Sequence, residues 1–165
     1  MLFEIIEKAA AEQVEITLVF SYIREYMLDY ITELLDEINR WCEEKRQSVE
    51  IVVNDWGMAS VVKKSRRNLI PSLGILLNKR RKDPRIPFKK GEQKWFERNS
   101  LNAGFYRNFL EREYGIQRFE WESCGYEQQI PPGKNSLHIP FYQTNTSQYC
   151  PLGAVCETGE RGRQK

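Results

Sequence analysis

The chain has 165 residues, of which 41% are hydrophobic and 12% aromatic, enough for the core of one ordinary domain. Its 25 basic and 23 acidic residues nearly cancel, so net charge predicts no particular class of partner. No run approaches about 18 apolar residues, and the first residues carry acids in place of a basic-then-apolar leader. We therefore expect a single cytoplasmic domain over residues 1–165, with neither a membrane span nor a secretory signal.

Hydrophobic periodicity predicts alternating helices and strands along the first part of the chain. We expect a helix at Leu2–Gln13, then a β-branched and aromatic strand at Val14–Ile23. The apolar stripe of Tyr26–Glu44 predicts a long amphipathic helix. The run Val49–Asn54 predicts a second strand, and Met58–Ser65 a short helix.

The same alternation continues in the rest of the chain. A third apolar strand is expected at Pro71–Asn78, followed by helical pieces around Lys94–Asn99 and Gly104–Tyr114. Ile116–Ser123 alternates with period two and predicts a fourth strand. After a turn-rich loop, Leu137–Asn145 is the expected fifth strand.

This order of elements indicates an α/β fold with a parallel sheet. A doubly wound sheet and a (β/α)8 barrel both fit it. A complete barrel typically needs about 250 residues, with roughly 200 as a floor. The chain supplies about five of eight strands and opens on a helix. Our preferred prediction is a partial (β/α)8 TIM-type barrel of about five parallel strands alternating with helices, as part of a larger barrel.

Polar residues follow the carboxyl ends of the expected strands. Asn54 and Asp55 follow the second strand, Asn78 and Lys79 the third, and Glu122 the fourth. Because ligands of parallel α/β folds bind at the carboxyl ends of strands, the pattern predicts a polar cleft there. Helix N-capping explains a residue such as Asp55 equally well. Asn78 and Lys79 favour ligand binding, because a cation is unfavourable at a helix N-terminus.

The run Asn78–Lys90 holds seven basic residues and one acid. Such a run is typical of a phosphate or nucleic-acid site. Aromatic residues are few within it, however, and we prefer a solvated loop. His138, the only histidine, falls inside an expected strand, where we predict a structural role and no Ser/His/Asp triad.

Four cysteines in a chain without a predicted signal favour free thiols or metal ligands over disulfides. Cys42 lies on the long helix and is expected to be a partly buried bystander. Cys124, Cys150 and Cys156 all follow expected strand ends, so they predict a thiolate site for zinc or an iron–sulfur cluster. The fourth ligand stays open: it is Cys42, a residue beyond Lys165, or absent.

Three stretches together resemble the collagenase-like peptidase family, U-thirty-two in peptidase nomenclature. They are Val49–Met58, Leu73–Ile86 and Ser136–Cys156, and the resemblance covers most of residues 14–156. It implies a (β/α)8 barrel longer than this chain. Members are described as peptidases acting on collagen, as proteins of tRNA or rRNA modification, or as accessories of oxygen-independent hydroxylation in ubiquinone synthesis.

The last branch carries an iron–sulfur cluster on four cysteines. By this resemblance, Cys124, Cys150 and Cys156 would be ligands of a [4Fe-4S] cluster. The chain departs from the family in two ways. Ile75 stands where relatives carry an arginine, which removes a bidentate partner for a carboxylate or phosphate. There is also no obvious nucleophile and no zinc motif for a peptidase.

Three hypotheses about function follow. In the first, the chain is an enzyme in which Asn54 and Asp55 orient the substrate or a proton, Lys79 supplies positive charge, and Glu122 is an acid–base group. In the second, it is a non-catalytic scaffold that completes its barrel with a partner chain or by self-association, because open sheet edges invite pairing. In the third, which we favour least, Asn78–Lys90 binds RNA.

Overall fold

The structure is a computed structural model, and it describes residues 1–63, 66–80, 88 and 94–140. Helices and strands alternate along the chain, and β4 and β5 are joined by a loop, as the sequence predicts. The elements are α1 (Leu2–Ala11), β1 (Thr17–Val19), η1 (Glu25–Met27), α2 (Leu28–Lys45), β2 (Val49–Val53), α3 (Trp56–Lys63), β3 (Leu69–Leu73), α4 (Lys94–Glu97), η3 (Ser100–Asn102), α5 (Gly104–Tyr114), β4 (Arg118–Glu122) and β5 (Lys134–His138).

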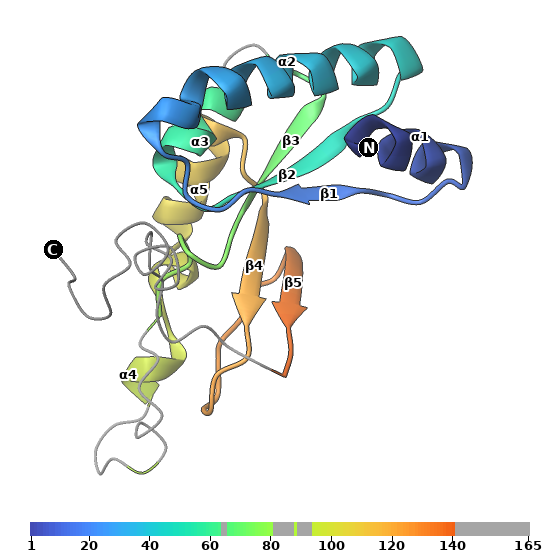
Figure 1. Ribbon diagram of the computed structural model, residues 1–165. Coiled ribbons are helices and arrows are strands. Elements are labelled where there is room, and N and C mark those ends of the chain that lie inside the picture. Colours follow the sequence, from blue (N-terminus) through green and yellow to red (C-terminus); the bar gives the residue numbers. More distant parts are fainter. Residues whose placement is uncertain (64–65, 81–87, 89–93, 141–165) are drawn as a thin grey trace, which may run out of the picture.

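The five strands form one sheet in the order β1-β2-β3-β4-β5, and every neighbouring pair is parallel. The sheet is curled into a half-barrel, with α2, α3 and α5 on its outer side (Figure 1). The prediction of an α/β fold with about five parallel strands is therefore confirmed. Its finer part, that these strands belong to an eight-stranded TIM-type barrel, stays a prediction.

The hydrophobic core lies between the sheet and these outer helices. Alternate residues of β2 and β4 face the helices, because successive side chains of a strand point to opposite faces. On β4 these are Phe119 and Trp121. The helices contribute buried side chains, namely Leu35, Ile38, Trp41, Cys42, Met58, Ala59, Val62 and Leu110. The other face of the sheet, which we call the inner face, therefore carries the remaining strand residues.

The third strand ends earlier than we predicted. The prediction was Pro71–Asn78, whereas β3 is Leu69–Leu73. At Gly74 the chain leaves the sheet, and the carbonyl of Gly74 accepts hydrogen bonds from the amides of Leu77 and Asn78, both at 3.1 Å. Asn78 therefore lies in a turn beyond the strand, and its interpretation as the residue at the strand's tip is wrong.

Two other strand boundaries also differ from the prediction. β5 is Lys134–His138 in place of Leu137–Asn145, and Pro140, two residues later, has no amide hydrogen to extend a ladder. Residues 141–145 of the predicted strand lie outside the described residues. β1 occupies only three residues of the predicted strand. None of the helices in the described ranges has the length and apolar character needed to cross a bilayer.

Candidate functional site

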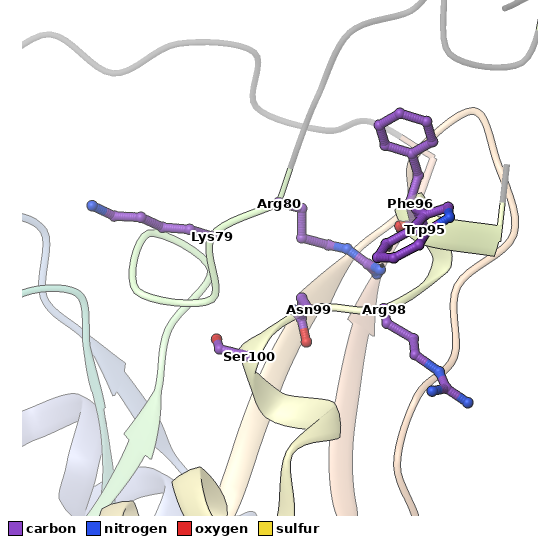
Figure 2. Close-up of a pocket in the computed structure, with 7 residues that line it drawn as sticks. All are labelled: Lys79, Arg80, Trp95, Phe96, Arg98, Asn99 and Ser100. Carbon is purple, nitrogen blue, oxygen red and sulfur yellow. Dashed lines mark hydrogen bonds between the residues drawn. The ribbon is translucent and has the colours of Figure 1, made fainter. Parts of the chain in front are cut away.

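A hollow lined by charged, polar and aromatic residues lies beyond β3 and β4 (Figure 2). It has a volume of about 610 Å³, within the range of small-molecule sites. Two segments form it: the turn after β3 and the short helices α4 and η3 that precede α5. We call it the basic–aromatic pocket, and its lining residues are Lys79, Arg80, Trp95, Phe96, Arg98, Asn99 and Ser100.

A pair of asparagines, the buried Asn78 and the partly buried Asn99, joins the two segments. The amide nitrogen of Asn78 donates to the backbone carbonyl of Glu120 at 2.8 Å, and its oxygen accepts a hydrogen bond from the side chain of Asn99. Asn99 in turn caps η3 by accepting from the amide of Leu101 at 3.0 Å. The two segments of the pocket are therefore held against β4 by side-chain hydrogen bonds, which fix the position of its walls.

Arg80 forms the inner wall of the pocket. Its guanidinium donates to the carbonyl of Glu97 at 2.8 Å and to the side chain of Gln128. The same group lies 5.5 Å from the ring centre of Trp121 and 5.9 Å from that of Tyr126, within cation–π range. Arg80 is thus held by carbonyls and rings, and its main role is to connect α4 with the loop after β4.

Tyr126 lies at the same wall of the pocket, where its ring faces the guanidinium of Arg80. Burial, with the neighbouring Cys124 as the next cause, raises the pKa of Tyr126 to about 12, although the positive charge of Arg80 opposes the shift. Tyr126 is therefore a neutral phenol at physiological pH. It is a packing partner of the guanidinium and has no role as a base.

The outer rim of the pocket is cationic and aromatic. Lys79 and Arg98 are exposed, and they extend to opposite sides of the hollow (Figure 2). Arg98 also donates to the side chain of Gln129 at 2.7 Å, which orients it. The indole of Trp95 lies on the Arg98 side of the hollow in Figure 2 and is 76% exposed, although tryptophan is the residue type that buries the most area. The rim can bind an anion that carries an aromatic group.

Asn54 and Asp55, the predicted tip residues of β2, bind backbone groups of neighbouring loops. Asn54 is buried; its amide donates to the carbonyl of Phe20 at 2.8 Å and accepts from the amide of Leu76 at 3.1 Å. Asp55 accepts from the amides of Met58 at 2.7 Å and Ile23 at 3.1 Å. The capping interpretation of Asp55 is confirmed, and the catalytic roles of both residues stay predictions.

Glu122 lies elsewhere, at the carboxyl end of β4 on the inner face, and its side chain is buried. Its neighbour in the register is His138 of β5. The imidazole of His138 is about half exposed, and its Nε2 lies 3.2 Å from a carboxylate oxygen of Glu120. The structure therefore places the only histidine beside two glutamates. We missed this cluster because we predicted His138 near the start of a longer strand, whereas it is the last residue of β5.

One polar network on the inner face links all five strands. The carboxylate of Glu50 accepts from Thr17 at 2.8 Å and from Ser72, and it lies 3.3 Å from the guanidinium of Arg118. Arg118 then donates to Ser136 at 2.7 Å. Sequence reasoning missed this network; the signal available for it was the alternation of charged and aromatic residues in β4, "RFEWE". Within this network the negative charge of Glu50 is balanced by the positive charge of Arg118.

The described cysteines lie at opposite ends of the sheet. Cys124 follows β4, and its thiol donates to the carbonyl of Tyr126 at 3.5 Å. Cys42 is fully buried in α2 beside Val49, the first residue of β2, and burial raises the pKa of its thiol. Because the strands are parallel, one thiol is at the carboxyl end and the other at the amino end. Cys42 therefore cannot complete a cluster that includes Cys124.

The other two predicted ligands, Cys150 and Cys156, lie outside the described residues. Within the described part of the chain, no group of three or more histidine, cysteine or acidic side chains is arranged to hold a metal ion. Cys124 alone supplies one ligand of the four that a [4Fe-4S] cluster requires. The cluster thus stays a prediction from the family resemblance.

Comparisons of this chain with protein-family models, with curated proteins and with solved structures gave no significant match. The candidate site therefore rests on its own geometry. Of the four predicted catalytic residues, the structure brings only Lys79 to the basic–aromatic pocket. Asn54 and Asp55 form hydrogen bonds with backbone groups of neighbouring loops, and Glu122 lies on the inner face of the sheet.

Proposed function

We propose that this protein binds RNA through the basic–aromatic pocket. The observation that carries the proposal is a single hollow whose lining includes two exposed cations, Lys79 and Arg98, and an exposed indole, Trp95. Cations supply the sequence-independent affinity for phosphates, and aromatic rings supply stacking surfaces for bases. The run 78–90 contains seven basic residues in all, so five others accompany Lys79 and Arg80 in the sequence.

RNA binding fits the geometry better than peptide hydrolysis does. A peptidase needs an activated nucleophile or a metal-bound water near its substrate. The predicted acid, Asp55, has both carboxylate oxygens engaged by backbone amides. The pocket that holds Lys79 contains no described histidine, cysteine or carboxylate. We therefore favour the hypothesis that the sequence alone ranked last, and the resemblance to the peptidase family stays a prediction.

The electrostatic part of the proposal is tested by the salt dependence of binding. For about three phosphate contacts, the affinity for a fluorescein-labelled 12-nucleotide RNA should fall about 20-fold between about 50 and about 200 mM salt. Lys79→Ala and Arg98→Ala should each weaken binding and each lower the slope of log affinity against log salt by about 0.7. Fluorescence anisotropy measures both quantities.

Lys8→Ala is the matched control, because Lys8 is an exposed cation on α1, away from the pocket. It should leave the affinity and the salt slope unchanged. A DNA strand of the same sequence tests which polynucleotide is the ligand, since the two differ at the 2′-hydroxyl. Binding that is absent at low salt, or that the control weakens as much as Lys79→Ala does, would contradict the proposal.

We also propose, as a second candidate, that the half-barrel associates with another chain, which we take to be a second copy. The observation that favours this is the pair of open sheet edges, β1 and β5, each hydrogen-bonded on one side only in the described residues. Apolar side chains are exposed at these edges, namely Val19, Leu137 and Ile139. Unpaired edges of this kind invite strand pairing.

Size-exclusion chromatography coupled to light scattering tests this candidate. Over a concentration series we expect a species of twice the monomer mass. Leu137→Lys should shift it towards the monomer, because a charged side chain on an edge strand opposes pairing. A strict monomer at every concentration would rule out self-association without affecting the RNA proposal.

A further inference from the structure

We infer that the protein binds a small apolar α-amino acid in a second pocket, at the amino ends of the strands on the inner face of the sheet. Arg118 and Lys134 bind the carboxylate of the ligand, and Glu15 binds its ammonium group. This inference goes beyond the proposed RNA binding and does not depend on it, because the basic–aromatic pocket lies past the carboxyl ends of β3 and β4.

The second pocket, which we call the amino-end pocket, is built by all five strands of the curled sheet (Figure 1). Each strand contributes a residue at or next to its first position. The pocket has a volume of about 400 Å³, at the small end of ligand sites, which span roughly 300–1,000 Å³. Its charged lining residues are Glu15, Glu50, Arg118 and Lys134. It therefore suits a small ligand that carries charge.

The cations of β4 and β5 form one side of the pocket. Arg118 and Lys134 are register partners on adjacent strands, so both side chains leave the sheet on its inner face. Arg118 lies 3.3 Å from Glu50 through Nε and donates to Ser136 at 2.7 Å through Nη2, which leaves the hydrogens of Nη1 without an acceptor among the described residues. Lys134 is exposed and forms no ion pair or hydrogen bond within the described part of the chain. These donors can bind a carboxylate through charge-assisted hydrogen bonds.

An acid stands on the opposite side of the pocket. Glu15, just before β1, is exposed and has no partner in the ranges that the structure describes. The carboxylate of Glu50 is already shared by Thr17, Ser72 and Arg118, so Glu15 is the acid that remains for a cationic group. Because the guanidinium of Arg118 reaches across β3 to Glu50 on β2, it lies towards the acidic side. This arrangement favours a ligand whose two opposite charges are close together, as they are in an α-amino acid.

An apolar surface lies between the two charged sides. Ile70 of β3 is the register partner of Glu50, so it lies on the inner face, and 49% of it is exposed. Ile16 and Pro71 also line the pocket. Because covering apolar surface stabilises a complex, the ligand should carry an aliphatic side chain.

Heteronuclear NMR spectra of the full chain, titrated with L-leucine into the millimolar range, test the inference. The backbone amide resonances of Glu50, Ile70 and Arg118 should shift and saturate. Two analogues isolate the charges: 4-methylpentanoate lacks the ammonium group, and L-leucinamide lacks the carboxylate. Each should bind about tenfold or more weakly than L-leucine, because each loses charge-assisted hydrogen bonds. Absence of saturable shifts, or equal affinities for the three compounds, would overturn the inference and leave the RNA proposal intact.

Two variants assign the charges to residues. Lys134→Gln should weaken L-leucine binding about tenfold and leave L-leucinamide binding unchanged. Glu15→Gln should weaken L-leucine binding by a similar factor and leave 4-methylpentanoate binding unchanged. The retained analogue shows in each case that the variant is folded. Lys8→Gln on α1 and Glu37→Gln on α2, both at exposed positions, are the matched controls and should change nothing. Losses that are the same for all three compounds, or the same in the controls, would contradict the assigned contacts.

Discussion

Gly74→Ala is expected to lower the free energy of unfolding by about 2–4 kcal/mol. The added Cβ would lie 2.2 Å from the amide oxygen of Asn54 and 2.6 Å from its Cγ, far inside van der Waals contact. Asn54 cannot simply move away. It is buried, and its two hydrogen bonds, to Phe20 and Leu76, hold the loops after β1 and β3. The substitution therefore combines overpacking with the loss of buried hydrogen bonds.

Urea denaturation of four variants separates this cause from a general effect of alanine. Gly104→Ala is the matched control, because the nearest atom to its new Cβ is 4.0 Å away, and it should stay within about 1 kcal/mol of the wild type. In an Asn54→Ala background, Gly74→Ala should cost at least about 2 kcal/mol less than it does alone. Equal costs in the two backgrounds would show that the contact between Gly74 and Asn54 is not the cause.

The same contact explains why the sequence predicted β3 with the wrong bounds. Apolar residues stand on both sides of Gly74, so hydrophobic periodicity does not show where the strand ends. The end is set by Asn54, which lies 20 residues earlier and occupies the space that a side chain at position 74 would need. Strands whose apolar runs are bounded by polar residues, such as β2 and β4, were predicted to within two residues at each end.

The candidate site was harder to predict than the fold, because its parts are distant in sequence. We looked for aromatic residues inside the run 78–90, but those of the pocket, Trp95 and Phe96, follow that run. The hydrogen bond between Asn78 and Asn99 brings the two segments together. The signal for the pocket in the sequence was the segment "KWFERN", which follows the basic run closely and contains both aromatic residues. Likewise, the alternation in "RFEWE" predicted a strand but not the partner of each of its charges.

The inner-face network should be the second large contributor to stability. Glu50→Ala is expected to lower the free energy of unfolding by about 2 kcal/mol, because it leaves the hydroxyls of Thr17 and Ser72 and the guanidinium of Arg118 without their shared acceptor. The ionic share of this loss is small, since the side chain of Arg118 is 42% exposed and solvent screens the pair. Glu50→Gln, which keeps an oxygen acceptor, should therefore cost only about half as much.

Denaturation curves of both variants, with Glu43→Ala as control, test this account. Glu43 also accepts a side-chain hydrogen bond, from Asn39 at 2.9 Å, but on the exposed surface of α2, where a loss within about 0.5 kcal/mol is expected. A double-mutant cycle of Glu50→Ala with Arg118→Ala should give a coupling energy of about 1 kcal/mol. If Glu50→Ala costs no more than the control, the network does not stabilise the sheet. In that case, the hydrophobic core between the sheet and the outer helices would alone stabilise the curl of the half-barrel.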